Sequence, residues 1–403
     1  MKNINILRTT NSLPFVFILS VFTILSQPLR VEAQVYTGDL TLSTQAQVNA
    51  FAYSEVTGNL TVSGADITNL DGLAGLNTVE GRLHIRNNPA LTSINGLTTL
   101  LSIGNWLDIS NNPSLTNIDG LSGLTSADNV NIGPNDALLN IDGLSSLTSL
   151  GQIGFDSNNA LTNLDGLAGL TTIGELAIWN NDALTNLDGL SGLTSVGYLW
   201  FGNNDALPNL DALTAITSIG LLEIFDNPSL TNIDGLSALS SVQDMYITNN
   251  DMLTNLDGLS ALSLARNLWI NDNDMLTNLD GLSALTSVGN RVRIYNNPVL
   301  NSFCGLYPLI NGGFTGMYIV TGNATNPTIA DILAAGSCSD FTLINALTDK
   351  NIGYLYDGDI LDLATLPTNQ LAIRANLEGP DVASVRFGFQ NVANFRIENF
   401  APY

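Results

Sequence analysis

Side chains that commonly catalyse reactions are scarce in this sequence. His84 is the only histidine, and no serine or cysteine motif of a nucleophilic enzyme lies near it. Asp108 and Asp156 are candidates for an acid–base pair, but the repeat spacing described below would hold them roughly 10 Å apart, too far for two carboxylates to act on one bond. The sequence has no glycine-rich phosphate loop and no metal-ligand spacing. We therefore expect a protein that is not an enzyme and needs no cofactor.

Acidic and amide side chains recur at a fixed spacing, each at the start of a turn dipeptide. The period is 24 residues for the first two steps and 23 for the next seven, which is typical of a solenoid of stacked repeats. A row of calcium ions is the lesser alternative, because each turn supplies a single carboxylate and Asp-Gly turn chemistry explains the column. The ten dipeptides are Asp71-Gly72, Asn95-Gly96, Asp119-Gly120, Asp142-Gly143, Asp165-Gly166, Asp188-Gly189, Asp211-Ala212, Asp234-Gly235, Asp257-Gly258 and Asp280-Gly281.

Apolar side chains within each repeat are spaced by three residues and then by two. In the repeat that begins at Leu184, the spacing of three predicts tight turns, and the spacing of two at Leu199 and Phe201 predicts a short strand with both side chains in the core. One strand per repeat would stack into a parallel sheet. An asparagine three residues after the strand would bond the backbone where the chain leaves the sheet. These asparagines are Asn88, Asn112, Asn158, Asn181, Asn204, Asn227, Asn250, Asn273 and Asn297.

The repeat resembles that of leucine-rich repeat proteins. It reads V-x-x-L-x-F-x-x-N followed by L-x-x-L-x-x-L, and its N-N-P or N-N-D after the strand is most similar to the receptor L-domain type of exported bacterial surface proteins. The resemblance covers about Gly58 to Leu300 and implies a curved or flat solenoid used for binding, without identifying a ligand. We therefore expect a right-handed parallel β solenoid. An extra residue before the strand predicts a local bulge in Val79–Leu83, Ile103–Leu107 and Val288–Val292.

Strand positions that alternate with the buried pair should point away from the core, and their residue types change along the solenoid. The first four repeats carry small or polar residues there, and each of the last six carries one aromatic residue. Strands about 4.8 Å apart would join these rings into an apolar strip on the order of 25 Å long, flanked by Glu223 and Arg293. Large exposed apolar patches usually mark binding sites, although aromatic side chains also stabilise one another across a sheet without a ligand. The predicted aromatic strip comprises Trp179, Trp200, Phe225, Tyr246, Trp269 and Tyr295.

The charge of the chain excludes some partners and leaves others open. The formal net charge is −24 and the only lysines are Lys2 and Lys350, so no basic stripe is available for nucleic acid or anionic lipid. We expect a secreted or cell-surface adhesion protein whose outward sheet face recognises a protein partner. A glycan is the alternative, ranked lower because no set of acidic and amide groups clusters around the rings to bind hydroxyls. A rigid spacer without a ligand is the third possibility.

The first 33 residues have the features of a signal peptide. Lys2 and Arg8 precede an apolar run from Leu13 to Leu25, and the small residues at positions 31 and 33 suit cleavage before Gln34. A retained membrane anchor is the lesser alternative. No second long apolar segment follows, so we expect no membrane insertion of the mature chain.

Non-repetitive segments should flank the solenoid, which we place at residues 58–302. Residues 34–57 are expected to form an N-terminal cap, and residues 303–339 a C-terminal cap with a short helix over 326–335. Cys304 and Cys338 are expected to form a disulfide that staples this end, with two free thiols as the alternative. The alternating residues of 340–403 predict an incomplete immunoglobulin-like β-sandwich, as in a fragment of a longer chain.

Overall fold

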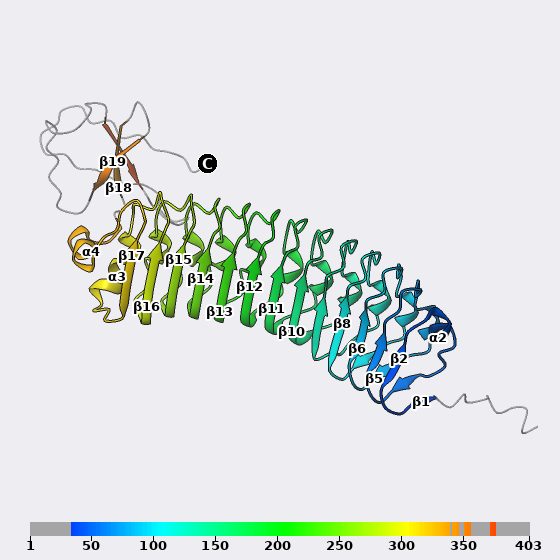
Figure 1. Cartoon of the computed structure of the whole chain (residues 1–403). Helices are drawn as coiled ribbons and strands as arrows, with labels where there is room; N and C mark the ends of the chain where they lie inside the picture. Colours follow the sequence, from blue (N-terminus) through cyan, green and yellow to red (C-terminus); the bar gives the residue numbers. More distant parts are fainter. Residues whose placement is uncertain (1–33, 339–340, 346–349, 356–370, 376–403) are drawn as a thin grey trace, which may run out of the picture.

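The described chain is a long stack of similar coils whose strands lie side by side on one face (Figure 1). The computed structural model describes residues 34–338, 341–345, 350–355 and 371–375. The predicted signal peptide lies outside the described residues. The predicted parallel stack with one main strand per repeat is confirmed.

Thirteen strands, one from each coil, form a single open sheet in which every neighbouring pair is parallel. The strands follow sequence order across the sheet. They are β2 (Leu40–Leu42), β4 (Leu60–Val62), β6 (Leu83–Arg86), β8 (Trp106–Ser110), β9 (Asn129–Ile132), β10 (Ser149–Asp156), β11 (Thr172–Trp179), β12 (Ser195–Gly202), β13 (Ser218–Phe225), β14 (Ser241–Thr248), β15 (Leu264–Asn271), β16 (Ser287–Tyr295) and β17 (Met317–Thr321).

The coils near the N-terminus differ from later ones because their strands are split in two. The extra residue in Val79–Leu83 and in Ile103–Leu107 separates a two-residue strand from the main one, whereas the two pieces merge into strands of eight or nine residues from β10 to β16. In Val288–Val292 the extra residue stays inside β16 and shifts its register against β15, so the predicted bulge is confirmed there. The short pieces form their own parallel sheet of β1 (Val35–Tyr36), β3 (Glu55–Val56), β5 (Thr78–Val79) and β7 (Ser102–Ile103).

A short 3₁₀ helix occupies each position where the sequence predicted an Asp-Gly turn. The glycine does not have a positive φ; it is required because a Cβ on Gly189 would collide with the carbonyl oxygen of Leu164 in the preceding coil. Ala212 replaces this glycine in η7, the only described 3₁₀ helix whose following N–H does not bond to the first carbonyl. The helices are η1 (Asp71–Leu73), η2 (Asn95–Leu97), η3 (Asp119–Leu121), η4 (Asp142–Leu144), η5 (Asp165–Leu167), η6 (Asp188–Leu190), η7 (Asp211–Leu213), η8 (Asp234–Leu236), η9 (Asp257–Leu259), η10 (Asp280–Leu282) and η11 (Cys304–Leu306).

The apolar side chains of every coil meet along the axis of the stack. Burying each such side chain contributes about 1.5–3 kcal/mol, and the coils share these contacts with both neighbours. In one coil the side chains that are at most 2% exposed are Leu184, Leu187, Leu190, Leu193, Val196, Leu199 and Phe201.

Buried asparagines form a continuous ladder where the chain leaves the sheet. The Nδ2 atom of Asn204 donates to the carbonyl oxygens of Gly202 and Ile178, and its Oδ1 atom accepts from the backbone N–H of Asn181. The residue before it, Asn203, has a φ of 51°, a left-handed conformation that asparagine tolerates. The ladder comprises Asn88, Asn112, Asn135, Asn158, Asn181, Asn204, Asn227, Asn250, Asn273, Asn297 and Asn323, of which Asn135 and Asn323 were not identified from the sequence.

Short helices cover both ends of the stack. At the N-terminal end α2 (Gln45–Asn49) is capped by Thr44 and buries Val48. At the C-terminal end α3 (Tyr307–Asn311) precedes β17 and α4 (Ile329–Ala335) follows it, and β17 extends the main sheet into the predicted cap. The helix expected over 326–335 begins at residue 329, because the Thr328 side chain caps it.

The predicted disulfide between Cys304 and Cys338 is present, with Cα atoms 4.7 Å apart. It joins η11 to the segment that follows α4 and so closes the C-terminal end of the stack. Asp280 lies beside it and accepts a hydrogen bond from the Ser302 hydroxyl, while burial raises the pKa of Asp280. These two cysteines and Asp280 are the only cluster of three potential metal ligands in the described part of the chain, and the disulfide already joins two of them.

The described pieces of residues 340–403 form one antiparallel sheet. It consists of β18 (Phe341–Asn345), β19 (Lys350–Leu355) and β20 (Leu371–Ala375), with β18 in the centre. The second sheet that a β-sandwich requires would fall outside the described residues.

Replacing a ladder asparagine should destabilise the stack strongly. In Asn204→Ala the carbonyls of Gly202 and Ile178 and the N–H of Asn181 lose their buried partners, and we expect a loss of about 3 kcal/mol in the free energy of unfolding. Urea unfolding followed by circular dichroism measures it. The control is Asp205→Ala on the next, exposed residue, and equal effects of the two changes would contradict the structural role of the ladder.

Candidate functional site

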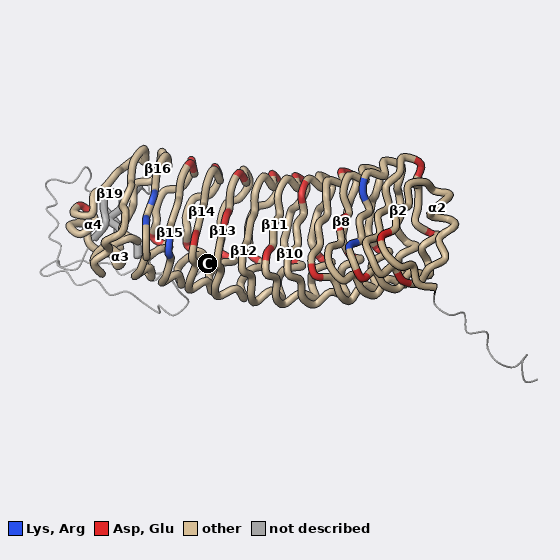
Figure 2. The backbone as a smooth tube through the Cα atoms, turned by 60° about the horizontal axis from the view of Figure 1, so that its bottom comes forward, with Lys and Arg blue, Asp and Glu red and all other residues tan. Residues whose placement is uncertain are grey.

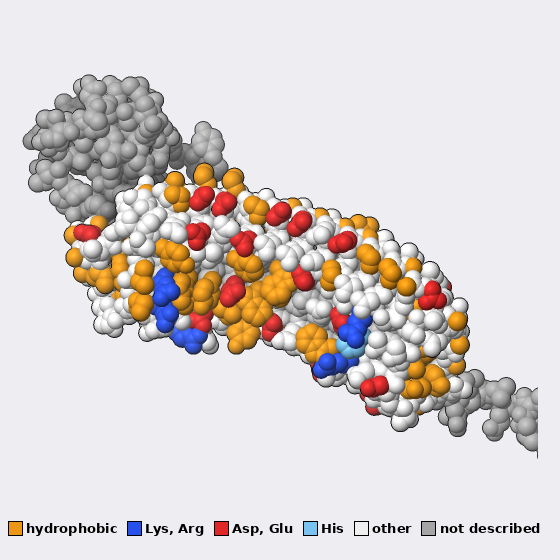
Figure 3. Space-filling view, in the orientation of Figure 1, with side chains coloured by type: hydrophobic (Ala, Val, Ile, Leu, Met, Phe, Trp, Pro, Cys, Tyr) orange, Lys and Arg blue, Asp and Glu red, His pale blue; other side chains and the backbone are white. Residues whose placement is uncertain are grey.

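The positive charges of residues 34–338 lie on one face of the solenoid. This region contains five arginines and no lysine. They cluster at two places along the stack, one near β6 and one at β15 and β16 (Figure 2). The outward face of the thirteen-stranded sheet, meaning the side away from the core, also carries a group of hydrophobic side chains beside the second arginine cluster (Figure 3). The five arginines are Arg82, Arg86, Arg266, Arg291 and Arg293.

Three columns of side chains, one more than predicted, point outward where the strands are eight or nine residues long. The first column runs through Ala177, Trp200, Glu223, Tyr246, Trp269 and Arg293, and the second through Trp179, Gly202, Phe225, Thr248, Asn271 and Tyr295. The third runs through Glu175, Tyr198, Leu221, Asp244, Asn267 and Arg291. The third column was not predicted, because the apolar spacing in each repeat indicated a strand with only two outward positions.

The predicted aromatic strip is present but is divided into clusters. All six predicted rings lie on the outward face and are partly exposed. Trp200 lies 6.4 Å from Trp179 and 6.1 Å from Tyr198 between ring centroids, with nearly parallel planes. Tyr198 belongs to the third column, and at 48% it is more exposed than any predicted ring. Phe225 leans onto the strand before it, where a Cβ on Gly202 would collide with its ring.

A second aromatic cluster lies nearer the C-terminal end. Tyr246 and Trp269 stack with centroids 4.3 Å apart and planes 10° apart. The guanidinium carbons of Arg291 and Arg293 lie 5.6 Å and 5.9 Å from the centroid of Trp269, which is the geometry of a cation–π contact. Tyr295 occupies the same sheet face beside Asn271 and has no ring–ring contact among the described residues.

Glu223 lies between the two aromatic clusters. The sequence had predicted a position at the flank of the strip instead. Trp200 and Tyr246 are its neighbours in register on the adjacent strands. Burial among these groups raises the pKa of the Glu223 carboxyl. Arg293, in contrast, does lie at the C-terminal flank of the rings, as expected.

Acidic and amide groups accompany the rings in the third column. Glu175 accepts a hydrogen bond from the amide of Gln152. Asp244 accepts from Arg266 and from Asn267, and the bond from Arg266 is the main reason that the pKa of Asp244 is lowered. The premise that no such groups surround the rings was therefore wrong, because the residues that supply them lie in the column that the sequence analysis missed.

The outward face near the N-terminus has a different character. His84 contacts Asp108 through Nδ1 at 3.3 Å, and the other carboxylate oxygen of Asp108 accepts a bond from the Asn131 amide at 3.1 Å. Arg82 directly precedes β6 and Arg86 ends it, and both are exposed. Asp108 and Asp156, the carboxylates considered as an acid–base pair, occupy different columns of this face and bond to different side chains.

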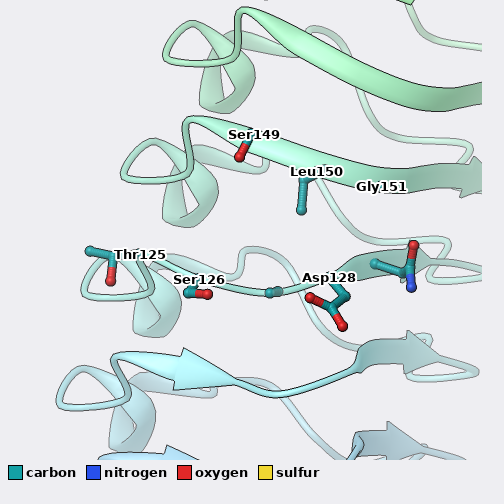
Figure 4. Close-up of a pocket in the computed structure, with 8 residues that line it drawn as sticks. Thr125, Ser126, Asp128, Ser149, Leu150 and Gly151 are labelled. Carbon is teal, nitrogen blue, oxygen red and sulfur yellow. The ribbon is translucent and has the colours of Figure 1, made fainter. Parts of the chain in front are cut away.

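A pocket with a volume of about 440 Å³ lies away from the rings, at the edge where the split strands give way to continuous ones (Figure 4). Thr125, Ser126 and Asp128 line it from one coil, and Ser149 and Gly151 line it from the next. Asp128 is the only charged side chain in the lining, so the pocket does not bring together a group of catalytic or metal-binding residues.

No protein-family model matches this chain, and no curated protein shows significant similarity to it. Among the described residues, no helix is long and apolar enough to cross a bilayer.

The position of Glu223 predicts a pH dependence of stability. A carboxyl whose pKa is raised in the folded state binds more protons folded than unfolded, so its contribution to stability is present at acidic pH and is lost as the pH rises through the raised value. We expect Glu223→Gln to raise the melting temperature at pH 7 and to have little effect near pH 4. Thermal unfolding at both pH values tests this. Glu80→Gln, at an exposed site, controls for the change in charge. An equal effect of Glu223→Gln on the melting temperature at both pH values would contradict the predicted pH dependence.

Proposed function

We propose that this chain is a non-catalytic recognition protein of the cell exterior whose outward sheet face binds sugar rings of a glycan. The observation that carries this proposal is the third outward column, which puts carboxylate and amide groups directly beside nearly parallel aromatic rings. Sugars expose C–H faces that pack on aromatic rings and hydroxyls that bond to carboxylates and amides. Both kinds of group are present within the same strands.

The site is suited to an extended ligand. The rings come from successive coils, and strands about 4.8 Å apart give the face a regular repeat that a chain of sugar units can follow. The side chains stand on a hydrogen-bonded sheet with a fully buried inner face, so little conformational freedom is lost when a ligand binds.

A protein partner is the second candidate. Tryptophan, tyrosine and arginine are the residues that most often dominate protein–protein binding energy, and Trp269 with Arg291 and Arg293 is such a combination. It was the preferred partner in the sequence analysis, and it now ranks second because the polar groups around the rings suit hydroxyls.

We also propose that the solenoid is right-handed and belongs with the leucine-rich repeats of the receptor L-domain type, on its V-x-x-L-x-F-x-x-N pattern, and that residues 340–403 form part of an immunoglobulin-like sandwich. A crystal structure of the chain would test the handedness and the second sheet.

Export is part of the proposal, supported by the N-terminal sequence and by the disulfide. We expect the exported chain to begin at Gln34. N-terminal sequencing of the secreted protein checks this, and an uncleaved N-terminus would favour a retained anchor.

Removing one central ring should abolish most of the glycan affinity. Trp200→Ala removes the ring that contacts both Trp179 and Tyr198, and we expect a loss of about 2 kcal/mol, or roughly 30-fold in Kd. The measurement is a glycan-array screen of the full chain followed by calorimetry with the best ligand.

The matched control is Trp106→Ala, which removes a tryptophan from the same sheet face but from β8, outside the clusters. Full binding by the Trp200→Ala variant would exclude the ring face as the site. Binding to a surface protein and to no glycan would favour the second candidate, and no binding to either would favour a rigid spacer.

A further inference from the structure

Two buried nitrogen atoms of the outward face have no hydrogen-bond partner in the protein. They are the Nε atoms of Arg291 and Arg293, and no other described side chain has such an atom. Buried polar groups in folded proteins are nearly always paired, so a pair of unpaired donors in one place needs an explanation. Both side chains are otherwise partly exposed at the end of the aromatic clusters, so the remaining N–H groups of each guanidinium are the donors that an anionic ligand could reach.

The two guanidinium groups are held together by the fold. Arg291 and Arg293 are two residues apart on β16, so both side chains leave the same face of the sheet. Both lie against Trp269, which stacks on Tyr246. The ring therefore holds two positive charges side by side, an arrangement that is unfavourable until an anion joins them.

Neither guanidinium forms an ion pair with a described carboxylate, although Asp244 attracts Arg291 electrostatically. The nearest acidic group of the third column, Asp244, is occupied by Arg266 and Asn267. On the other side the neighbours in register are Met317 for Arg291 and Ile319 for Arg293. Within the described part of the chain the ion pairs are His84 with Asp108 and Arg266 with Asp244, so neither Arg291 nor Arg293 takes part in one there.

We propose that Arg291 and Arg293 form an anion subsite that binds the carboxylate or sulfate group of an acidic sugar. This inference rests on the proposed function, because it assigns the charge of one unit of the same glycan. Guanidinium groups bind both oxyanions with paired, charge-assisted hydrogen bonds.

The rest of the face limits where the negative charge of the ligand can lie. Glu175 on β11 and Glu223 on β13 face outward among the rings, and each would repel an anion placed over it. A uniformly charged polyanion is therefore disfavoured. The expected ligand is an oligosaccharide with neutral units over β11 to β14 and an acidic unit at its end over β15 and β16.

The test compares matched pairs of oligosaccharides that differ only in a terminal acidic sugar. An array with neutral, carboxylate-terminated and sulfate-terminated members of each pair is probed with the full chain and with the Arg291→Gln/Arg293→Gln double variant. We expect the acidic members to bind more tightly to the unchanged protein, and the double variant to lose about tenfold in affinity for them while retaining its affinity for neutral members. The preferred acidic member identifies the carboxylate or the sulfate.

A double variant at the other arginine cluster, Arg82→Gln/Arg86→Gln, changes the net charge of the same face equally and should leave the preference intact. Arg291→Lys/Arg293→Lys keeps the charge and should recover only part of the affinity, because lysine lacks the paired donors. Melting temperatures of all variants establish that they are folded.

The outcomes separate this inference from the function on which it rests. Glycan binding without preference for acidic members, or with a preference that survives the double variant, would overturn the anion subsite and leave the glycan face standing. Absence of glycan binding would overturn both. An acidic peptide is included as a further probe. If the protein binds this peptide through the two arginines and binds no glycan, the subsite belongs to a protein partner and the proposal is overturned.

Discussion

The buried asparagine of each coil is the interaction on which the rest of the structure depends. Where the chain leaves the sheet it turns through a left-handed residue into the interior, and the backbone groups there are shielded from water. Such groups must be paired inside the protein. The side chain of Asn204 donates to one carbonyl of its own coil and to one of the preceding coil, and it accepts from a backbone N–H of the preceding coil. The buried backbone groups of each coil therefore find hydrogen-bond partners only when the neighbouring coils are in place. The ends of the ladder are closed in the same way, by the N–H of Gly64 at one end and by Asn326 at the other.

A second contact sets how closely the coils approach on the opposite side of the core. The glycine of each 3₁₀ helix lies against a carbonyl of the preceding coil, where a side chain would collide. The alanine of η7 occupies this position, and the backbone bond that closes the other helices is missing there. With asparagine at one corner and glycine or alanine at another, the interior is apolar in every coil and varies only among apolar side chains, whereas positions that face outward differ in charge and polarity.

The candidate site follows from that freedom. Its rings, carboxylates and guanidinium groups come from strands β11 to β16, so no single repeat contains it. A continuous sheet holds these side chains at a fixed spacing, which favours binding without rearrangement. Arg82 and Arg86 at one end are exposed, whereas Arg291 and Arg293 at the other lie against a ring, so the same residue type has a different environment in different coils.

Much of the fold was determined by the sequence alone, because a period of 23 or 24 residues with leucines and asparagine in fixed places can bury its apolar side chains only by stacking. The parallel strands, the asparagine column and the outward position of the six predicted rings follow from that period, and the disulfide between Cys304 and Cys338 was expected from two cysteines in an exported chain. The tertiary structure decided what the period does not encode. Whether a strand has two or three outward positions depends on pairing with the neighbouring coil, and that pairing brought Tyr198, Asp244 and Arg291 to the face. Asn135 and Asn323 joined the ladder because their coils stack in register. The unpaired state of two arginines is likewise a property of the assembled sheet, since only there do Trp269, Met317 and Ile319 surround their charges in place of a carboxylate.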